Sequence, residues 1–443
     1  MMAGPAAATP SARQSALTVQ AAGGAALAAV LGWLLLGDLG IAMRDRAALP
    51  SSVEMLRVLG ASDTTTSLLL SVVPALLSMF VVPWVGWRSD RFHSRWGRRR
   101  PFLLVAAPAG CAALLGLAWS PELGGAADVL LGAHSPGLRT CRLAVFGLFW
   151  TLFDCAALCA LSLFTGLVND VVPFGWLGRF YGLFRIVGLG AGIAFHTWLF
   201  ALTERHLGTI VAATGIVFGV ALVIMCIKVH EQPAPARPPA RDRAGLRECL
   251  GGTGMLWAIG VFVCAGVTFG PFNTFYQFYA HAAGVPKATL GMLTAAGYCV
   301  SIGTAFGIGA LVDRLGALRV SAVTMALYCV LAALGWLVAT DAAGFQAVYL
   351  GHVIVSGTWF TAAASLPMAL FPRERFVQLN ATKDLVVVAG NIVLGLVQGP
   401  LLDLSGHDYR LTLLSGAVGG LLCLACMARI QALPSPTHKN GDT

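Results

Sequence analysis

GWRSDRFHSRWGRRRPF occupies residues 86–102 and separates two long apolar stretches of the chain. It contains six arginines, and a charge at the centre of a bilayer costs at least about 2.5 kcal/mol. The stretch therefore predicts a short loop at one face of a membrane. Because Lys and Arg collect in cytoplasmic loops, it also predicts the orientation of the whole chain.

The composition is that of a polytopic membrane protein. Of the 443 residues, 57% are hydrophobic and 11% are charged, whereas about a quarter of the residues of a soluble domain are charged. The formal net charge of +9 raises the question of a nucleic acid partner. The basic residues, however, lie in short loops and form no basic face with interleaved aromatic residues. We expect contact with the lipid bilayer and no nucleic acid partner.

Apolar windows of about 20 residues, the length needed to cross the hydrocarbon, recur twelve times along the chain. They lie at residues 20–43, 65–87, 101–120, 143–167, 180–202, 209–229, 254–280, 289–312, 320–340, 347–370, 385–402 and 411–430. With these windows, most of the 29 Lys and Arg residues fall on the side of the two termini. Both termini are therefore predicted to be cytoplasmic.

The windows divide into two sets of six. The predicted divisions are a cytoplasmic tail at 1–19, a six-helix bundle at 20–229, a linker at 230–250, a second six-helix bundle at 251–430 and a cytoplasmic tail at 431–443. The linker is rich in Pro and Arg and cannot bury a core. The spacing Gly-x-x-x-Asp-Arg at residues 86–91 recurs at residues 309–314. A repeat at corresponding spans is typical of secondary transporters built from two related halves.

This pattern resembles the major facilitator superfamily, whose loop between helices 2 and 3 carries a Gly-x-x-x-Asp-Arg-x-Gly-Arg-Arg type motif. More narrowly, residues 89–102 are similar to the SDRxxSRxGRRRPF loop of the sucrose and glycoside proton symporters. Phe149, Trp150 and Asp154 resemble a Phe-Trp-x-x-Asp element in helix 4 of those carriers, with one extra residue between. The charged run at residues 44–46 departs from the family pattern. The resemblance implies an all-α membrane protein of twelve transmembrane helices with the major facilitator fold.

The two repeated motifs are predicted to form a gate at the inner face. An Asp at the end of a helix accepts charge-assisted hydrogen bonds from arginines and from the amides of a neighbouring helix, and glycines allow a tight turn. The alternative is that the arginines only anchor the topology. The predicted gating residues are Gly86, Asp90, Arg91, Gly97, Arg98, Arg99, Arg100, Gly309, Asp313 and Arg314.

Ionisable residues inside the predicted spans are candidates for ion coupling. A carboxylate near the midplane can take up a proton on one side and release it on the other, and a nearby guanidinium favours its charged form. Arg185 lies at a different predicted depth from Asp154, so Asp170 is an equal candidate for its partner. Asp38 either joins a cation or sugar site or reaches the external interface. The predicted coupling residues are Asp154, Arg185, Asp38 and Asp170.

A sugar site needs flat aromatic faces for C–H surfaces and amides or carboxylates for hydroxyl groups. Asn273 and Gln277 stand four residues apart on one predicted helix with Tyr276 beside them. The predicted substrate-binding residues are Asn273, Tyr276, Gln277, Trp150, Trp359, His352 and Asn391. The GxxxG pairs Gly303/Gly307 and Gly416/Gly420 are expected to serve close helix packing.

The sequence therefore predicts a secondary transporter that works by alternating access, as a monomer, in a bacterial cytoplasmic membrane. Proton-coupled symport of a sugar or glycoside is favoured. The alternatives are a proton-antiporting exporter of drugs or metabolites, a sodium-coupled symporter of the same fold, and a membrane sensor that does not transport. The sequence has no P-loop, HExxH or GxSxG motif, so no enzyme is predicted. The 11 cysteines lie mostly inside apolar spans, and we expect no metal or cofactor.

Overall fold

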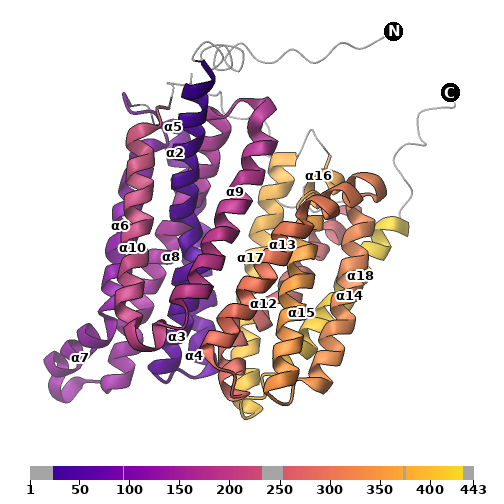
Figure 1. Ribbon diagram of the computed structural model, residues 1–443. Coiled ribbons are helices and arrows are strands. Elements are labelled where there is room, and N and C mark those ends of the chain that lie inside the picture. Colours follow the sequence, from indigo (N-terminus) through magenta and orange to yellow (C-terminus); the bar gives the residue numbers. More distant parts are fainter. Residues whose placement is uncertain (1–22, 93, 232–252, 373–375, 433–443) are drawn as a thin grey trace, which may run out of the picture. The chain divides into compact units, whose positions relative to one another are not determined.

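The computed structural model describes residues 23–92, 94–231, 253–372 and 376–432. These residues form helices and turns and no strand (Figure 1), so the all-α prediction is confirmed. The α-helices are α2 (Gly23–Met43), α3 (Leu49–Val58), α4 (Asp63–Ser67), α5 (Val73–Arg91), α6 (Arg100–Ala118), α7 (Ser120–Leu131), α8 (Leu138–Val171), α9 (Phe174–Ala194), α10 (Thr203–Lys228), α12 (Thr253–Ala282), α13 (Lys287–Leu315), α14 (Ala317–Val338), α15 (Ala342–Ala363), α16 (Leu366–Leu370), α17 (Phe376–Leu404) and α18 (Leu411–Ala432).

Among the described residues, eleven helical segments are long and apolar enough to cross a membrane. The tenth predicted window corresponds to α15, which has 22 residues but is more polar because it carries Gln346 and His352. Polar side chains in a span are tolerated where they face other helices, and His352 is buried. Long helices thus occur at all twelve predicted windows.

The first span is longer than predicted. The chain stays helical from Gly23 to Val58 and passes through a π-helical turn, η1 (Arg44–Ala48). The predicted end of this span at residue 43 was wrong, because the spanning segment continues to Val58. Arg44 is accommodated because its guanidinium pairs with Asp154, and such an attraction offsets part of the cost of removing charge from water.

The chain divides into two compact units. Unit 1 comprises residues 1–55, 77–195 and 202–239, and unit 2 comprises residues 56–76, 196–201 and 240–443. In unit 1, α6 lies between α8 and α10, and α2 packs against α10 (Figure 1). In unit 2, α12 packs along α18, α13 and α14 pack against α15, and α17 packs against α4. The first short segments of unit 2 thus come from the part of the chain assigned to the first bundle.

The predicted domain boundaries stay a prediction. The tail at 1–19, most of the linker at 230–250 and most of the tail at 431–443 lie outside the described residues. Further π-helical turns, η2 (Leu68–Val72) and η4 (Phe195–Leu199), lie within a few residues of points where the chain passes from one unit to the other. Pro74 follows η2 and has no N–H to donate to the carbonyl group of Leu70, which disturbs the regular helix there.

Glycines of α18 allow close packing on α12. A Cβ atom added to Gly416 would lie 2.9 Å from the carbonyl oxygen of Thr268, and one added to Gly419 would lie 2.9 Å from the Thr268 nitrogen. The expectation for the pair that begins with Gly416 is therefore confirmed, because small residues let the two backbones approach. Around the Cβ position of Gly303, by contrast, nothing described lies within 4 Å.

Gly416→Val should destabilise the protein by about 1–3 kcal/mol, because the added side chain meets backbone atoms that move only if α12 shifts. The loss should be measured as a lower melting temperature of the purified protein in detergent. Gly303→Val makes the same change at an open position and should alter the stability by less than about 0.5 kcal/mol. An equal loss in both variants would show that the backbone contact is not the cause.

Candidate functional site

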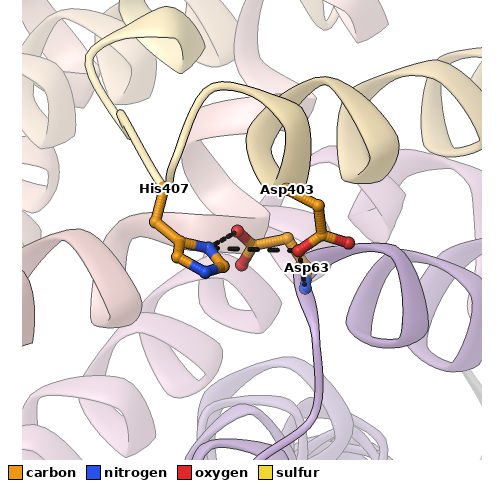
Figure 2. Close-up of side chains that lie close together, drawn as sticks. All are labelled: Asp63, Asp403 and His407. Carbon is orange, nitrogen blue, oxygen red and sulfur yellow. Dashed lines mark hydrogen bonds and ion pairs between the residues drawn. The ribbon is translucent and has the colours of Figure 1, made fainter.

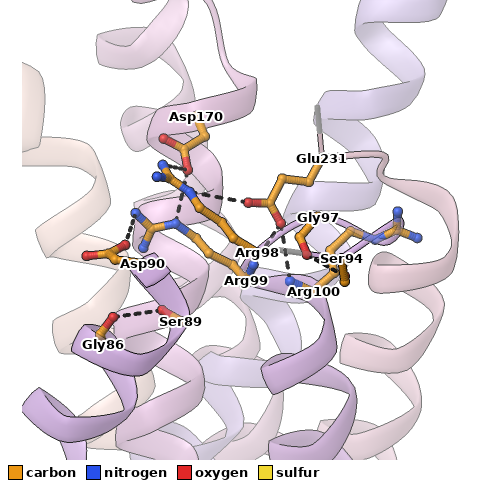
Figure 3. Close-up of polar contacts among 10 residues, drawn as sticks. All are labelled: Gly86, Ser89, Asp90, Ser94, Gly97, Arg98, Arg99, Arg100, Asp170 and Glu231. Atoms are coloured by element: carbon orange, nitrogen blue, oxygen red, sulfur yellow. Dashed lines mark hydrogen bonds and ion pairs between the residues drawn. The ribbon is translucent and has the colours of Figure 1, made fainter. Parts of the chain in front are cut away.

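The arginine-rich loop is held in unit 1 by two acidic residues (Figure 3). Asp170, near the end of α8, accepts hydrogen bonds from Arg98 Nη2 at 2.7 Å and from Arg99 Nε at 3.0 Å. Glu231, which follows α10, accepts from the backbone N–H of Arg99 at 2.9 Å and of Arg100 at 3.3 Å. Asp170, which was predicted for ion coupling, contacts arginines of the predicted gate, and Glu231 was not predicted at all. The loop is therefore clamped between the ends of α8 and α10.

Asp90 contacts an arginine of the loop at the exposed surface. Its Oδ1 lies 3.4 Å from Arg99 Nη2, and 58% of its side chain is exposed. Arg91 places its guanidinium over the ring of Trp87, 4.2 Å from the ring centroid. Exposed ion pairs contribute little to stability, so the pair of Asp90 and Arg99 is not by itself what orders the loop.

Gly97 makes room for Glu231. Its φ of +93° lies in the left-handed region, which only glycine adopts at low cost. A Cβ atom at this position would lie 2.7 Å from the Cβ atom of Glu231. Ser94 Oγ closes the turn by donating to the carbonyl oxygen of Gly97 at 2.6 Å, and Ser89 Oγ donates to that of Gly86 at 2.9 Å. The loop glycine therefore has a definite structural role.

Acidic neighbours favour the charged form of the loop arginine Arg98. Burial lowers the pKa of Arg98, but its hydrogen bond to Asp170 and the nearby carboxylate charges raise it by more, so the net pKa lies above its ordinary value. Arg100 is 6% exposed and donates from Nε to the carbonyl oxygen of Cys226 at 2.7 Å. These arginines thus do more than mark the topology, since several of them hold neighbouring helices.

The repeated motif in unit 2 has no matching network. Asp313 and Arg314 lie at the exposed end of α13, one turn after Gly309. Within the described part of the chain, neither charged residue has an ion-pair partner. Gly316 follows with φ +87°. The two copies therefore share a left-handed glycine and differ in their ionic contacts.

Asp154 forms a buried ion pair in unit 1. It lies on α8 and is 3% exposed, and its Oδ1 accepts a hydrogen bond from Arg44 Nε at 2.7 Å. Arg44 Nη1 also lies 2.5 Å from Asp45 Oδ1. One guanidinium therefore bridges two carboxylates inside a spanning helix, where ionisable groups are functional candidates.

The two carboxylates that were predicted as partners of Arg185 make ion pairs with other arginines. Asp154 is paired with Arg44, and Asp170 is paired with arginines of the loop. Arg185 itself lies partly buried on α9. Asp38 is 1% exposed, and its Oδ2 has no hydrogen-bond partner among the described residues. Each of the two carboxylates that were predicted as partners of Arg185 thus pairs with a different arginine in the structure.

Several predicted substrate residues of unit 2 meet around His352. This side chain is 2% exposed, and its Nε2 lies 2.9 Å from Asn273 Oδ1 while its Nδ1 lies 2.8 Å from the hydroxyl of Tyr328. An amide oxygen only accepts, so Nε2 carries the proton and Nδ1 accepts from the tyrosine hydroxyl. On the next turn of α12, Gln277 Nε2 donates to Tyr276 Oη at 3.2 Å. The result is a polar network that joins α12, α14 and α15.

Aromatic rings surround this network. Phe269 packs edge to face on Tyr328 with centroids 4.6 Å apart and lies 5.2 Å from the ring of Trp359. Tyr276 stacks on Tyr349 with centroids 5.4 Å apart and planes inclined by 16°. The indole nitrogen of Trp359 is buried without a hydrogen-bond partner among the described residues. Ring faces and an amide thus lie together, as sugar recognition requires.

The remaining two predicted substrate residues lie elsewhere. Trp150 belongs to unit 1, is 1% exposed and packs against Phe153 with ring centroids 5.7 Å apart. Asn391 lies on α17, and its Oδ1 would be 2.6 Å from a Cβ atom added to Gly266. Gly266 precedes Asn273 by about two helical turns, so Asn391 lies along α12 at a distance from the His352 network.

Sequence comparisons relate this geometry to known proteins. The profile of the family described as MFS/sugar transport protein matches residues 55–374. The proton-associated sugar transporter A of Homo sapiens is 30% identical over 229 residues, which cover 49% of this chain and 29% of the human protein. A sucrose transport protein of Oryza sativa subsp. japonica is 38% identical over 68 residues, which cover 15% of this chain and 12% of the rice protein. The match therefore spans less than a third of the length of either relative.

The fold is similar to that of a solved transporter. The crystal structure of the nucleoside transporter NupG superposes with a TM-score of 0.68, and the superposition covers 91% of this chain and 100% of that chain. The two sequences are 11% identical. At this identity the likeness concerns the fold alone.

Glu231→Gln should loosen the loop, because the variant loses the negative charge that accepts from the first amides of α6. A capping carboxylate contributes about 0.5–2 kcal/mol, which corresponds to a rise of about 2- to 30-fold in amide exchange. Hydrogen–deuterium exchange of Arg99 and Arg100 in the purified protein measures this. Asp313→Asn changes a carboxylate of the repeated motif and should leave these amides unchanged. Unaltered exchange in Glu231→Gln would mean that Glu231 does not hold the loop.

Proposed function

Because the chain belongs to the MFS/sugar transport protein family, we propose that it moves a sugar or glycoside across a membrane by alternating access, coupled to protons. Membership makes the chain a multi-pass membrane transporter and not an enzyme. The predicted major facilitator fold is confirmed by the family match and by the structural likeness. The substrate, the coupling ion and the membrane belong to the proposal.

The His352 network is the observation that carries the substrate proposal. Asn273 is exposed on a spanning helix while its neighbour Phe272 is buried. An exposed amide at this depth is costly against lipid, so we infer that it faces an aqueous path. Its oxygen is engaged by His352, which leaves its NH₂ group to donate to a sugar hydroxyl. The names of the sequence relatives support the same substrate class.

The pair of Asp154 and Arg44 supports coupling to protons. A proton and the guanidinium compete for the same carboxylate, because protonation removes the charge that Arg44 contacts at 2.7 Å. Arg44 then keeps its contact with Asp45. Uptake of one proton by Asp154 therefore breaks its ion pair with Arg44, which lies in η1 directly after α2. This is a local change that a transport cycle can use.

The proposed orientation places both termini and the arginine-rich loop in the cytoplasm. The clamp formed by Asp170 and Glu231 then lies at the inner face, where it holds α6 to the ends of α8 and α10. In this proposal the protein works as a monomer in a bacterial cytoplasmic membrane. The charge bias of the loops supports the orientation.

Asp154→Asn should abolish accumulation of labelled sugar driven by a pH gradient, because the amide cannot take up and release a proton. Uptake into proteoliposomes measures this, with downhill exchange of the same sugar as the test of an intact binding site. Asp128→Asn is the control, because this carboxylate accepts a hydrogen bond from Ser135 and takes no part in the pair of Asp154 and Arg44. This variant should accumulate sugar like the wild type. Undiminished accumulation by Asp154→Asn would remove this residue from the proton path.

Asn273→Ala should raise the half-saturating sugar concentration about 2- to 12-fold, since a hydrogen bond contributes about 0.5–1.5 kcal/mol. Concentration-dependent uptake measures it. Asn380→Ala removes an amide that contacts Asp384 on α17 and should leave the half-saturating concentration unchanged. A fall in maximal rate alone in Asn273→Ala would argue against a contact with the sugar.

A further inference from the structure

A charged cluster in unit 2 has no part in the proposed function (Figure 2). The Asp63 cluster consists of Asp63 at the start of α4, Asp403 near the end of α17, and His407 in the turn before α18. Asp63 begins the spanning segment of 29 residues that ends at Arg91. At about 1.5 Å per residue, the cluster therefore lies at the end of this span opposite to the arginine-rich loop.

His407 connects the two carboxylates. Its Nδ1 lies 2.6 Å from Asp63 Oδ2 and 3.9 Å from Asp403 Oδ1. The hydroxyl of Tyr409 donates to Asp63 Oδ1 at 3.1 Å. The Asp63 side chain is 2% exposed and that of His407 is 57% exposed. A buried carboxylate is thus reached by protons through an imidazole that is open to solvent.

Asp403 fixes the start of α4. Its Oδ1 accepts from the backbone N–H of Asp63 at 2.9 Å, and its Oδ2 accepts from the N–H of Thr64 at 2.9 Å and from the Thr64 hydroxyl at 2.5 Å. The first amides of a helix have no partner within the helix. A carboxylate from a segment 340 residues away therefore supplies the cap for this one.

Residues 63–72 also pack closely against α17 beside the Asp63 cluster. Ser67 Oγ donates to the carbonyl oxygen of Gly395 at 2.6 Å. A Cβ atom added to Gly399 would lie 2.7 Å from the Cα atom of Thr64. Residues 63–72 therefore lie directly on the glycine-lined side of α17. Their separation from α17 would break these contacts together with those of the cluster.

The donor set fits a proton better than a metal ion. The ligand atoms of Asp63, Asp403 and His407 lie within 4.8 Å of one another, which is close enough for a shared cation. Both oxygens of each carboxylate, however, already accept from N–H or O–H groups. A metal ion would have to displace these donors, whereas a protonated imidazole is itself the donor.

We propose that His407 and Asp63 form a proton-binding site that latches residues 63–72 onto the end of α17. Its role in transport rests on the proposed alternating access, but it requires neither a sugar substrate nor proton binding at Asp154. The same span continues in unit 1 from residue 77. Release of its first turns from α17 is therefore a step that alternating access can use.

The sign of the pH dependence follows from His407. Its hydrogen bond to Asp63 raises the pKa of the imidazole, burial opposes this, and the charges of Asp63 and Asp403 add to the rise. The closed latch therefore favours the protonated imidazole. Its stabilisation is complete below the pKa of the free side chain and is lost as pH rises through the raised pKa.

The other ionisable groups facing the cluster do not titrate near neutral pH. Arg410 donates to Asp408 at 2.8 Å and lowers the pKa of that carboxyl. Burial raises the pKa of the Tyr409 hydroxyl. Tyr279 of α12 packs on the ring of Tyr409 with centroids 6.2 Å apart. Among the cations facing the cluster, His407 is thus the one whose ordinary pKa lies near neutrality, and its hydrogen bond to Asp63 raises that pKa.

Amide exchange at residues 63 and 64 tests the proposal, because these amides donate to Asp403. In the purified full-length protein, their protection, corrected for the intrinsic pH dependence of exchange, should fall several-fold from pH 5.5 to pH 8.5. His407→Gln should flatten this dependence. Asp63→Asn preserves side-chain volume and should flatten it too. His281→Gln changes a histidine of unit 2 that contacts Arg57 and should keep the wild-type dependence.

Protection of the wild type that is independent of pH would overturn the proposal, and so would an unchanged pH dependence in both His407→Gln and Asp63→Asn. Protection at pH 8.5 that is restored by added zinc ions would overturn it in favour of a metal site. Transport is read separately. A flat exchange profile with intact gradient-driven uptake removes only the latch, whereas absent uptake with a pH-dependent profile removes only the proposed function.

Discussion

The cost of leaving a charge unpaired in hydrocarbon is the constraint on which the rest of the structure depends. Arg44 stays inside a continuous helix because Asp154 accepts its hydrogen bond. Burial within the protein has a similar cost outside the hydrocarbon, and Arg98 of the loop, whose side chain is 13% exposed, lies 2.7 Å from Asp170. These ion pairs connect α8 to the segment after α2 and to the segment before α6. They therefore also hold neighbouring helices together.

The apolar windows predicted the long helices well because a span of about 20 apolar residues has few alternatives in a bilayer. Asn273 and His352 could be predicted as candidates for a related reason, since polar groups stand out in such a helix. The end of the first span was misplaced because the partner that accommodates Arg44, Asp154, is distant in the sequence. Glu231 was missed because it lies beside a Pro-rich stretch, and Asp63 was missed because an acid at a span end resembles an ordinary loop residue. In the structure, Ser62 also caps α4 by accepting from the Thr65 N–H.

Both copies of the repeated motif lie at the end of a helix and are followed by a glycine with a positive φ, and they differ in their ionic contacts. Gly97 and Gly316 both have positive φ values and precede a spanning helix, which is the requirement of a tight turn. Among the residues that the structure describes, only the first copy has an acidic clamp, formed by Asp170 and Glu231. The short spacing of Gly, Asp and Arg thus lies at the end of a helix in both copies, whereas the ionic contacts depend on residues far away in the sequence.

The second span has acid–base contacts of different character at its two ends. Near Arg91 the cations are guanidinium groups, which stay charged at any physiological pH. Near Asp63 the cation is an imidazole, whose charge changes close to neutrality and whose Nδ1 lies 2.6 Å from the carboxylate. A change in proton concentration near neutrality therefore acts on the charge of the imidazole at one end of this helix, whereas the guanidinium groups at the other end stay charged. An asymmetry of this kind gives the two faces of a membrane protein different responses to the same ion.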